Sequence, residues 1–376
     1  MILKKSTFFL LCTFVLIIVS LLTYLNYDRI WSFFTNKEWQ IADSIGKIEL
    51  ENYLTTCGTD SSFFVIDNNS VTGYSENMKK NAELSLSSKD VLTHSDGDYC
   101  IIGEKAGTSV SLISGNQLVW TNTINNASIL SVYVNKNGYS AVIYSQAGYK
   151  SLIKVFSNAG KELFTSYLAS TYAIDVAISN DNKTFAIAEV DTNGINVSSR
   201  IKVTSMEDAS ESTVKKYDIN SNEVVTDIEF TSNNKLVIMT DLKVYVLDND
   251  VIGEILNFEK ENIIMASIEN RRNIVTVRNE KNGLFNQSVE VCIYDFNVTA
   301  EPKKYELNSL PNRFVCTKNV IALDNGLEII FINDSGNFLK KCEYKGQLKD
   351  LKLFNEGNRA VLIFRNVTDF IKVGGI

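Results

Sequence analysis

The stretch VAISNDNKTFAI at residues 176–187 decides the fold that we expect for this chain. It reads as an apolar strand, a tight turn rich in Asn and Asp, and a second apolar strand. Asn, Asp and Gly favour such turns because they tolerate positive φ or cap the turn with their side chains. The same unit recurs as VYVNKNGYSAVI (132–143), IEFTSNNKLVIM (228–239), ASIENRRNIVTV (266–277) and LKLFNEGNRAVL (351–362). This pattern predicts an all-β body.

A second hairpin follows most of these copies. It reads SVSLISGNQLVW (109–120), LIKVFSNAGKELF (152–164), KVYVLDNDVIGEI (243–255) and EIIFINDSGNFLK (328–340). The two hairpins together give four strands per repeat, and the repeats open near residues 51, 90, 128, 173, 224, 262, 312 and 347. Their mean spacing of about 44 residues is typical of four-stranded β-propeller blades, which span roughly 40–50 residues.

We therefore expect an eight-bladed β-propeller over residues 47–376, with seven blades as the first alternative and a pair of β-sandwiches as the second. The last repeat supplies about three strands before Ile376. We expect residues 47–50 to add the missing fourth strand and close the ring, because an open ring would leave unpaired strand edges.

The segment between Lys5 and Asp28 carries no charge over residues 6–27. As a helix rising about 1.5 Å per residue it would cover about 33 Å, enough to cross the core of a bilayer. Its length and the lack of an A-x-A-like site favour an uncleaved anchor over a signal peptide, and Lys4 and Lys5 favour a cytoplasmic N-terminus. We expect a cytoplasmic tail at 1–5, a transmembrane helix at 6–27, a juxtamembrane stalk at 28–46 and a propeller outside the cell membrane.

The composition argues against several classes of protein. Hydrophobic residues make up 45% and charged residues 22% of the 376 residues, which fits a globular body. A formal net charge of −7 argues against nucleic acid as a partner. The sequence holds no glycine-rich phosphate loop and no Trp-Asp dipeptide of WD40 repeats, and its three Trp are too few for the docking motifs of quinoprotein propellers.

Six cysteines are present, and none forms a C-x-x-C pair, so we predict no zinc or redox motif. Cys12 lies in the apolar N-terminal segment. We interpret the other five as small apolar side chains in strands, with at most one disulfide whose members stay open: Cys57, Cys100, Cys292, Cys316 and Cys342.

His94 is the single histidine, and Ser95, Asp96 and Asp98 follow it closely. A catalytic triad depends on geometry and not on adjacency, so we interpret this segment as non-catalytic. The acidic turns lack the six to eight oxygen ligands that Ca²⁺ takes. We predict no catalytic, cofactor-binding or metal site, and we interpret the remaining charged or Asp-box-like segments as solvated turns: 96–98, 179–185, 215–216, 248–250, 271–272 and 303–304.

Residues 129–205 carry a resemblance to a known family. Its most specific parts are NGY at 137–139, GYKS at 148–151 and GKELF at 160–164. The chain resembles an uncharacterised family of single-pass, membrane-anchored β-propeller proteins of Gram-positive bacteria, known only as a domain of unknown function. More remotely it is similar to WD40-like and quinoprotein-like propellers. The resemblance implies a fold and a location, and it brings no catalytic residues.

We therefore expect no enzyme. The expected function is that of a membrane-anchored propeller that binds an envelope protein or scaffolds the envelope, with the lipid bilayer as its other partner. Because a fold alone does not fix a function, two alternatives stay open. One is a hydrolase or lyase that acts on glycans through carboxylates around the central channel. The other is an ectodomain that senses a small ligand.

Overall fold

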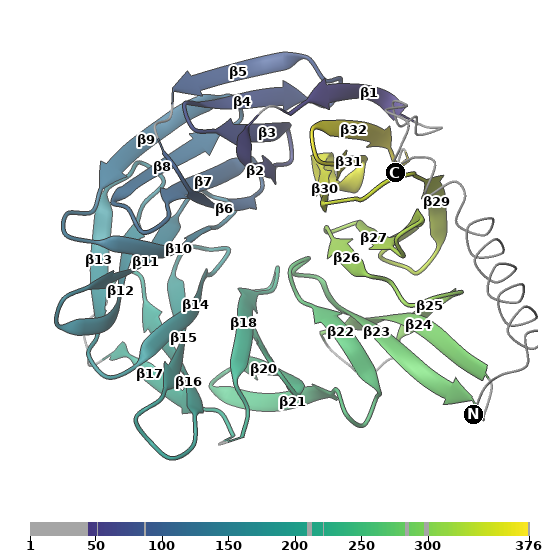
Figure 1. The fold of residues 1–376 in the computed structure, drawn as a ribbon. Helices are drawn as coiled ribbons and strands as arrows, with labels where there is room; N and C mark the ends of the chain where they lie inside the picture. The colour runs from purple at the N-terminus through teal and green to yellow at the C-terminus, as the bar shows by residue number, and fades with distance from the viewer. Residues whose placement is uncertain are drawn as a thin grey trace, which may run out of the picture.

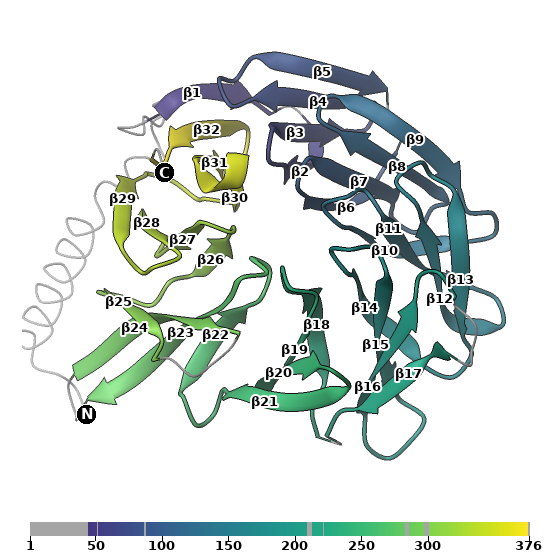
Figure 2. The same cartoon turned by 180° about the vertical axis from the view of Figure 1, so that it is seen from behind.

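The computed structural model describes residues 44–50, 52–85, 88–208, 213–220, 222–282, 286–296 and 301–374. Within these residues, strands β1 to β32 form eight antiparallel sheets of four strands each. The sheets stand side by side around a common axis as the blades of a propeller (Figure 1; Figure 2 from behind). The prediction of an all-β, eight-bladed β-propeller is confirmed, and the seven-bladed and sandwich alternatives are wrong.

In the first four blades the strands run in sequence order from the centre to the rim (Figure 1). Blade 1 consists of β2 (Tyr53–Gly58), β3 (Ser62–Asp67), β4 (Ser70–Ser75) and β5 (Lys80–Ser85). Blade 2 consists of β6 (Val91–Asp96), β7 (Tyr99–Glu104), β8 (Ser109–Ser114) and β9 (Gln117–Thr123). Blade 3 consists of β10 (Ser128–Val134), β11 (Ser140–Gln146), β12 (Tyr149–Phe156) and β13 (Glu162–Leu168). Blade 4 consists of β14 (Tyr172–Ile178), β15 (Thr184–Asp191), β16 (Ser198–Ser205) and β17 (Lys215–Asp218).

The next three blades repeat this order, and blade 8 departs from it. Blade 5 consists of β18 (Val225–Phe230), β19 (Leu236–Thr240), β20 (Lys243–Asp248) and β21 (Val251–Asn257). Blade 6 consists of β22 (Ile263–Ser267), β23 (Asn273–Asn282), β24 (Asn286–Asp295) and β25 (Lys303–Leu307). Blade 7 consists of β26 (Arg313–Cys316), β27 (Val320–Asp324), β28 (Glu328–Asn333) and β29 (Phe338–Glu343). Blade 8 consists of β30 (Asp350–Phe354), β31 (Arg359–Ile363) and β32 (Val367–Lys372), with β1 (Ser44–Glu49) at its rim, and a short 3₁₀ turn, η2 (Asn355–Gly357), joins β30 to β31.

Blade 8 closes the ring by joining the two ends of the described chain. Strand β1 pairs antiparallel with β32, and Lys47 lies opposite Asp369. This confirms the expected closure by residues 47–50, although the strand begins earlier, at Ser44, inside the segment predicted as a stalk. The closing strand therefore removes the open edge that β32 would otherwise present.

An aromatic triad packs the closing blade against blade 1. The rings of Phe63 and Phe370 meet edge to face with centroids 5.4 Å apart, and the Phe354 ring lies 6.0 Å from each of them. All three side chains are fully buried in one cluster that also holds Leu50, the residue after β1. Aromatic pairs in this geometry stabilise by about 0.5–1.5 kcal/mol beyond their burial, so the triad reinforces the strand pairing.

Asparagine side chains link the inner turns of successive blades. The Asn137 side-chain amide donates to the Asn180 carbonyl at 2.8 Å, and the Asn180 amide donates to the Thr231 carbonyl at 2.7 Å. The turn residues Asn182 and Asn234 have φ of 58° and 60°, as expected from the sequence. The Asn-rich turns thus have two structural roles: they reverse the chain, and their side chains link one blade to the next by hydrogen bonds.

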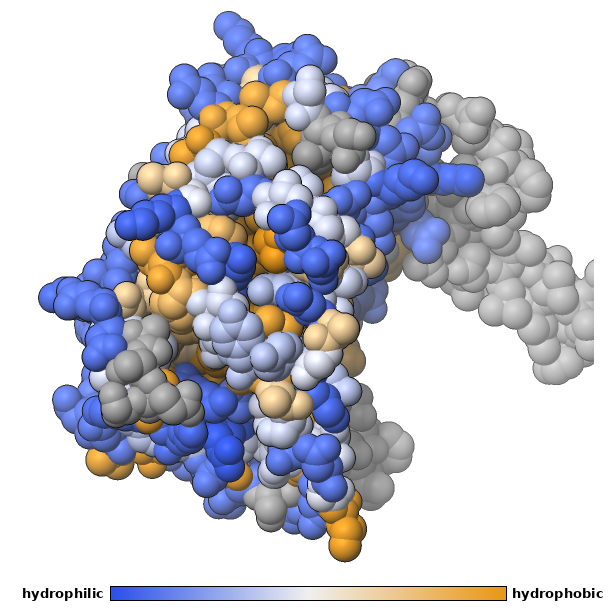
Figure 3. Space-filling view, turned by 90° about the vertical axis from the view of Figure 1, so that its left-hand side faces the viewer, coloured by the Kyte–Doolittle hydropathy of each residue, from blue (hydrophilic) through white to orange (hydrophobic). Residues whose placement is uncertain are grey.

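Apolar side chains on the outer strands are interspersed with hydrophilic ones. Figure 3, which faces the left side of Figure 1, shows orange residues among blue ones rather than one continuous apolar face. Exposed examples on the rim strands β9 and β13 are Leu118, Val119, Leu163 and Tyr167. Scattered apolar residues of this kind are normal on protein surfaces and need no partner to explain them.

The predicted tail at 1–5 and transmembrane helix at 6–27 lie outside the described residues, as does the predicted stalk up to residue 43. In the part of the chain that the structure describes, no helix is long and apolar enough to cross a bilayer.

The aromatic triad predicts that the closed propeller depends on Phe370. Phe370→Ala should lower the free energy of unfolding by about 3–5 kcal/mol, because it leaves a cavity where β32 meets blade 1. Phe338→Ala removes the same atoms from an exposed side chain on β29. It should change the free energy of unfolding by no more than about 0.5 kcal/mol. Chemical denaturation followed by fluorescence measures both, and equal losses would contradict the importance of the triad.

Candidate functional site

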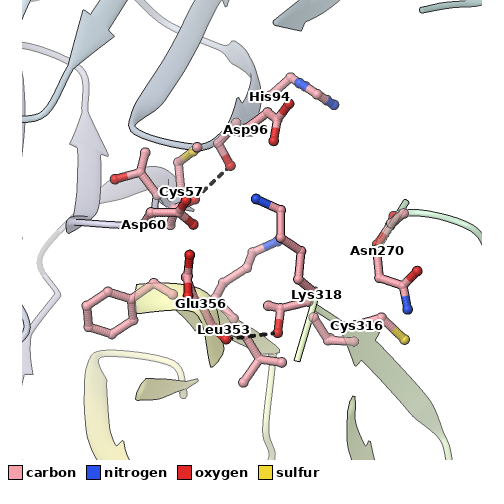
Figure 4. Close-up of a pocket in the computed structure, with 18 of the residues that line it drawn as sticks. Cys57, Asp60, His94, Asp96, Asn270, Cys316, Lys318, Leu353 and Glu356 are labelled. Carbon is pink, nitrogen blue, oxygen red and sulfur yellow. Dashed lines mark hydrogen bonds between the residues drawn. The ribbon is translucent and has the colours of Figure 1, made fainter. Parts of the chain in front are cut away.

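A cavity of about 350 Å³ lies at one end of the channel that the blades surround. Its walls come from the ends of the inner strands of blades 1, 2, 5, 6, 7 and 8 and from the turns that follow them (Figure 4). The inner strands all run in the same direction, so their carboxyl ends meet at this one mouth. Residues as distant in sequence as Cys57 and Glu356 therefore face the same space.

Polar and charged residues dominate the lining. The apolar part is small and includes Val315, Leu353 and Phe354. Five carboxylates and three cations line the cavity: Asp60, Asp96, Glu229, Glu269 and Glu356, with Arg271, Lys318 and Lys352. The mouth is therefore acidic overall.

One arginine ties four blades together across the channel. Arg271, from the turn after β22, forms ion pairs with Asp96 of blade 2 and with Glu229 of blade 5, the latter at 2.9 Å. It also donates to the Tyr133 hydroxyl of blade 3 at 3.0 Å. We call Asp96, Tyr133, Glu229 and Arg271 the Arg271 cluster. All four side chains are largely buried, so the cluster holds the inner strands at fixed positions.

The cluster corrects two interpretations of the sequence. Segments 96–98 and 271–272 were expected to be solvated turns, yet the Asp96 and Arg271 side chains are only 10% and 11% exposed. Arg272 does behave as expected, since it is 49% exposed and reaches Asp334 at 3.8 Å. The two arginines separate because Arg271 has φ of 57°, a left-handed turn conformation, and its side chain reaches into the channel.

His94 is held as a neutral ring beside this cluster. Its Nδ1 accepts a hydrogen bond from the Val134 N–H at 3.2 Å, and the ring stacks on Tyr133 with centroids 4.7 Å apart. Burial and, to a smaller extent, the nearby Arg271 charge lower the pKa of His94 to about 4. The adjacent Ser95 hydroxyl donates to the Gly58 carbonyl at 2.7 Å, so it is not paired with the histidine as a nucleophile would be.

A pair of carboxyl groups lies on the inner strands of blades 4 and 5. Burial raises the pKa of Asp227 to about 8 and that of Asp175 to about 6, and their proximity makes them share a proton. The Ile228 N–H donates to Asp175 at 3.0 Å. Burial also raises the pKa of Glu229 to about 7 in spite of Arg271. The two aspartates are not among the residues that line the cavity.

Four charged side chains at the mouth have no ion-pair partner among the described residues: Asp60, Glu269, Lys318 and Glu356. Figure 4 shows Lys318 extending into the space between Asp96 and Glu356. Glu356 sits in a strained turn, because it and Asn355 both have positive φ, at 52° and 51°. Burial raises the pKa of Asp60, and the Lys318 charge opposes that rise. These four side chains are free to pair with a charged binding partner.

No group of three or more His, Cys, Asp or Glu side chains is arranged to hold a metal ion in the described ranges. The turn at 248–250, also considered from the sequence, uses Asp250 to bind the Lys215 amine at 2.6 Å. Its other acid, Asp248, pairs with Lys235 at 2.9 Å. The side chains of both ion pairs are at least partly exposed to solvent.

A family model described as a family of unknown function, DUF5711, matches residues 35–373. The chain belongs to the DUF5711 family. The resemblance to a family known only as a domain of unknown function is thereby confirmed. No curated protein is significantly similar to this chain in sequence.

Several solved structures are similar in fold to this DUF5711 chain. The C-terminal WD40 domain of Sif2 has a TM-score of 0.58 at 13% identity, covering 89% of this chain and 99% of that one. The Dos1 propeller has a TM-score of 0.56 at 11% identity, with 89% and 96% covered. A eukaryotic initiation factor has a TM-score of 0.53 at 11% identity, with 85% of each chain covered. These likenesses confirm the expected WD40-like fold and show the fold alone.

Sequence patterns alone did not point to most of the residues that line the central channel of this protein. A usable signal was present, because Asp175 and Glu229 interrupt apolar strands, in AIDVAI and IEF. A charged residue at such a position is expensive to bury unless it has a partner. Lys318 and Glu356 lie in turns and carry no comparable signal.

The neighbouring arginines provide a matched pair of variants. Arg271→Met should lower the free energy of unfolding by about 3–5 kcal/mol, because Asp96 and Glu229 lose the cation that they surround. Arg272→Met should change it by no more than about 0.5 kcal/mol. Denaturant titration of both variants measures the difference, and equal values would show that the Arg271 cluster does not hold the blades.

The aspartate pair predicts how stability depends on pH. Between the ordinary Asp pKa of 3.8 and about 8, folded Asp227 keeps a proton that the unfolded chain has lost. Stability should therefore fall as the pH rises through this window. Asp227→Asn removes this titration, so it should raise the melting temperature by a few degrees at about pH 9 and change it little at about pH 4.

The control for this prediction is Asp98→Asn, which neutralises an exposed carboxyl in the turn after β6. Thermal melts of both variants across the pH range test the prediction. A pH profile of Asp227→Asn parallel to that of the parent chain would refute the proton shared by Asp175 and Asp227.

Proposed function

We propose that this protein is a membrane-tethered, extracytoplasmic recognition module that binds a basic segment of an envelope protein at the channel mouth and catalyses no reaction. The observation that carries the proposal is the set of charged side chains that face the cavity without an ion pair among the described residues, namely Asp60, Glu269, Lys318 and Glu356. A partner that supplies complementary charges would complete these interactions.

The lining favours a protein segment over an apolar small molecule. Pockets for small ligands are mostly apolar with a few polar groups, whereas this cavity is mostly polar. Arg271 is already bound by Asp96 and Glu229, so its charge is not free for a ligand. The remaining balance is acidic, and this supports a partner that presents Lys or Arg side chains.

The rigidity of the mouth supports a binding role. The Arg271 cluster and the asparagine contacts between turns hold loops from several blades in one arrangement. A site that is already ordered loses little conformational entropy when a partner binds. This feature is typical of propellers, which present loops on a rigid scaffold.

The proposed tether rests on the sequence. Residues 6–27 are uncharged and follow Lys4 and Lys5, which favours a cytoplasmic N-terminus. Residues 28–43 separate that segment from β1 and span at most about 55 Å when fully extended. A tether of this length would keep the propeller close to the outer surface of the cell membrane, where envelope proteins are within reach.

A second candidate is the carboxylate-dependent hydrolase or lyase. The raised pKa values of Asp227 and Glu229 favour it, because catalytic acids often have such values. Against it, Asp227 does not line the cavity and Glu229 is bound to Arg271. This candidate requires turnover of a polysaccharide by the purified protein that Glu229→Gln abolishes.

Photo-crosslinking in living cells tests the proposal. A photoreactive phenylalanine analogue is placed at Lys318 in one version and at Lys161, an exposed residue of the β12–β13 hairpin, in the other. Position 318 should capture one discrete partner protein, and position 161 should capture none. Adding Glu356→Lys to the first version should lower the yield several-fold, since it repels a basic segment.

The location is checked in the same cells. Protease added to intact cells should degrade the propeller, and the crosslinked species should stay in the membrane fraction. Equal capture from both positions, a yield unaffected by Glu356→Lys, or a propeller protected from external protease would each contradict the proposal.

A further inference from the structure

Two cysteines from neighbouring blades meet beside the cavity. Cys57 lies on β2 of blade 1 and Cys100 on β7 of blade 2, and their sulfur atoms are 3.0 Å apart. Both side chains are buried, at 5% and 0% exposed. Cys57 lines the cavity (Figure 4), whereas Cys100 is not among the residues that line it. A disulfide bond is about 2.05 Å long, so a closure of roughly 1 Å would join the two blades.

We propose that Cys57 and Cys100 form a disulfide site that staples blade 1 to blade 2 and exchanges with small organic disulfides through the cavity. Neither cysteine has a sequence neighbour that reveals the pair, because 43 positions separate them.

The surroundings assign different roles to the two thiols. The Cys100 thiol donates a hydrogen bond to the Cys57 sulfur, and this bond lowers the pKa of Cys57, with smaller help from Ser95 and Lys352. The same bond and burial raise the pKa of Cys100. Cys57 therefore forms the thiolate more readily, and it alone of the two faces the cavity. Cys57 is the attacking thiol and Cys100 is the resolving thiol.

The exchange balances in two steps. The Cys57 thiolate attacks one sulfur of a small disulfide, which forms a mixed disulfide and releases one thiolate. The Cys100 thiol then loses its proton to that thiolate and attacks the Cys57 sulfur, which forms the Cys57–Cys100 bond and releases the second thiolate. The second thiolate takes up a proton from water, which balances the proton that Cys57 gave up when it ionised. The protein thus loses two electrons and two protons, and the small disulfide is reduced to two thiols.

Other cysteines differ from this pair. Cys316 lines the same cavity from blade 7, but no second described sulfur atom is in hydrogen-bonding contact with it. The Cys292 sulfur instead accepts a hydrogen bond from the Arg278 Nε at 2.8 Å. Cys316 is therefore an internal control, because it has similar access to the cavity and lacks a resolving thiol.

The staple would tie together an apolar cluster shared by the two blades, which includes Phe64, Val91 and Ile102 besides the cysteines. Closing a loop of this length restricts the unfolded chain, so the oxidised protein should melt at a higher temperature than the reduced protein. The assignment does not depend on where the protein resides, although an extracytoplasmic site would favour the oxidised form.

The full chain in detergent, first reduced and then freed of reductant, is incubated with cystamine as the small disulfide. Denaturation in N-ethylmaleimide then alkylates every remaining thiol, and mass spectrometry identifies the peptides. We expect Cys57 and Cys100 to escape alkylation and to appear as one cross-linked peptide. The melting temperature should rise by several degrees, and dithiothreitol should reverse the rise.

Two variants complete the test. Cys316→Ser should keep the cross-link and the rise in melting temperature. Cys100→Ser should stop at a stable mixed disulfide of Cys57 with half of cystamine, without the rise. Full alkylation of Cys57 and Cys100 after cystamine, a cross-link between another pair, or a mixed disulfide that persists on Cys57 in the parent chain would overturn the proposal.

Discussion

The pairing of β1 with β32 is the contact on which the ring depends. Blades 1 to 7 are each built from one continuous stretch of chain, whereas blade 8 takes its rim strand from the other end of the described chain. The pairing joins residues more than 300 positions apart, such as Ile48 and Thr368. Contacts of such long range form late, and the aromatic triad of Phe63, Phe354 and Phe370 supplies the burial that stabilises them.

Closure also creates the channel site. A closed ring fixes the distance across the channel, and only then can Arg271 of blade 6 reach Asp96 of blade 2 as well as Glu229 of the adjacent blade 5. Because the inner strands all point the same way, the polar residues that follow them collect at one mouth. The charges that remain unpaired there, such as Lys318, are the ones on which the proposed binding role rests.

The architecture was readable from sequence because it repeats. Each inner strand begins within three residues of its predicted position, and Asn182 and Asn234 adopt the left-handed turns expected of them. The site was not readable because it does not repeat. Nothing local distinguishes Arg271 from Arg272, and the contact between Cys57 and Cys100 exists only once two blades have packed. Periodicity thus predicts the scaffold, whereas the site depends on which turn meets which across the channel.

Strand β1 has a mechanical consequence. It is the described segment nearest the proposed tether, so any tension transmitted along the chain ahead of Ser44 acts first on β1. That strand is held by its hydrogen bonds to β32 and by neighbours such as Leu50. If a load peeled β1 away, blade 8 would keep three strands and β32 would become an exposed edge. The joint that completes the ring is therefore also the place where force would open it.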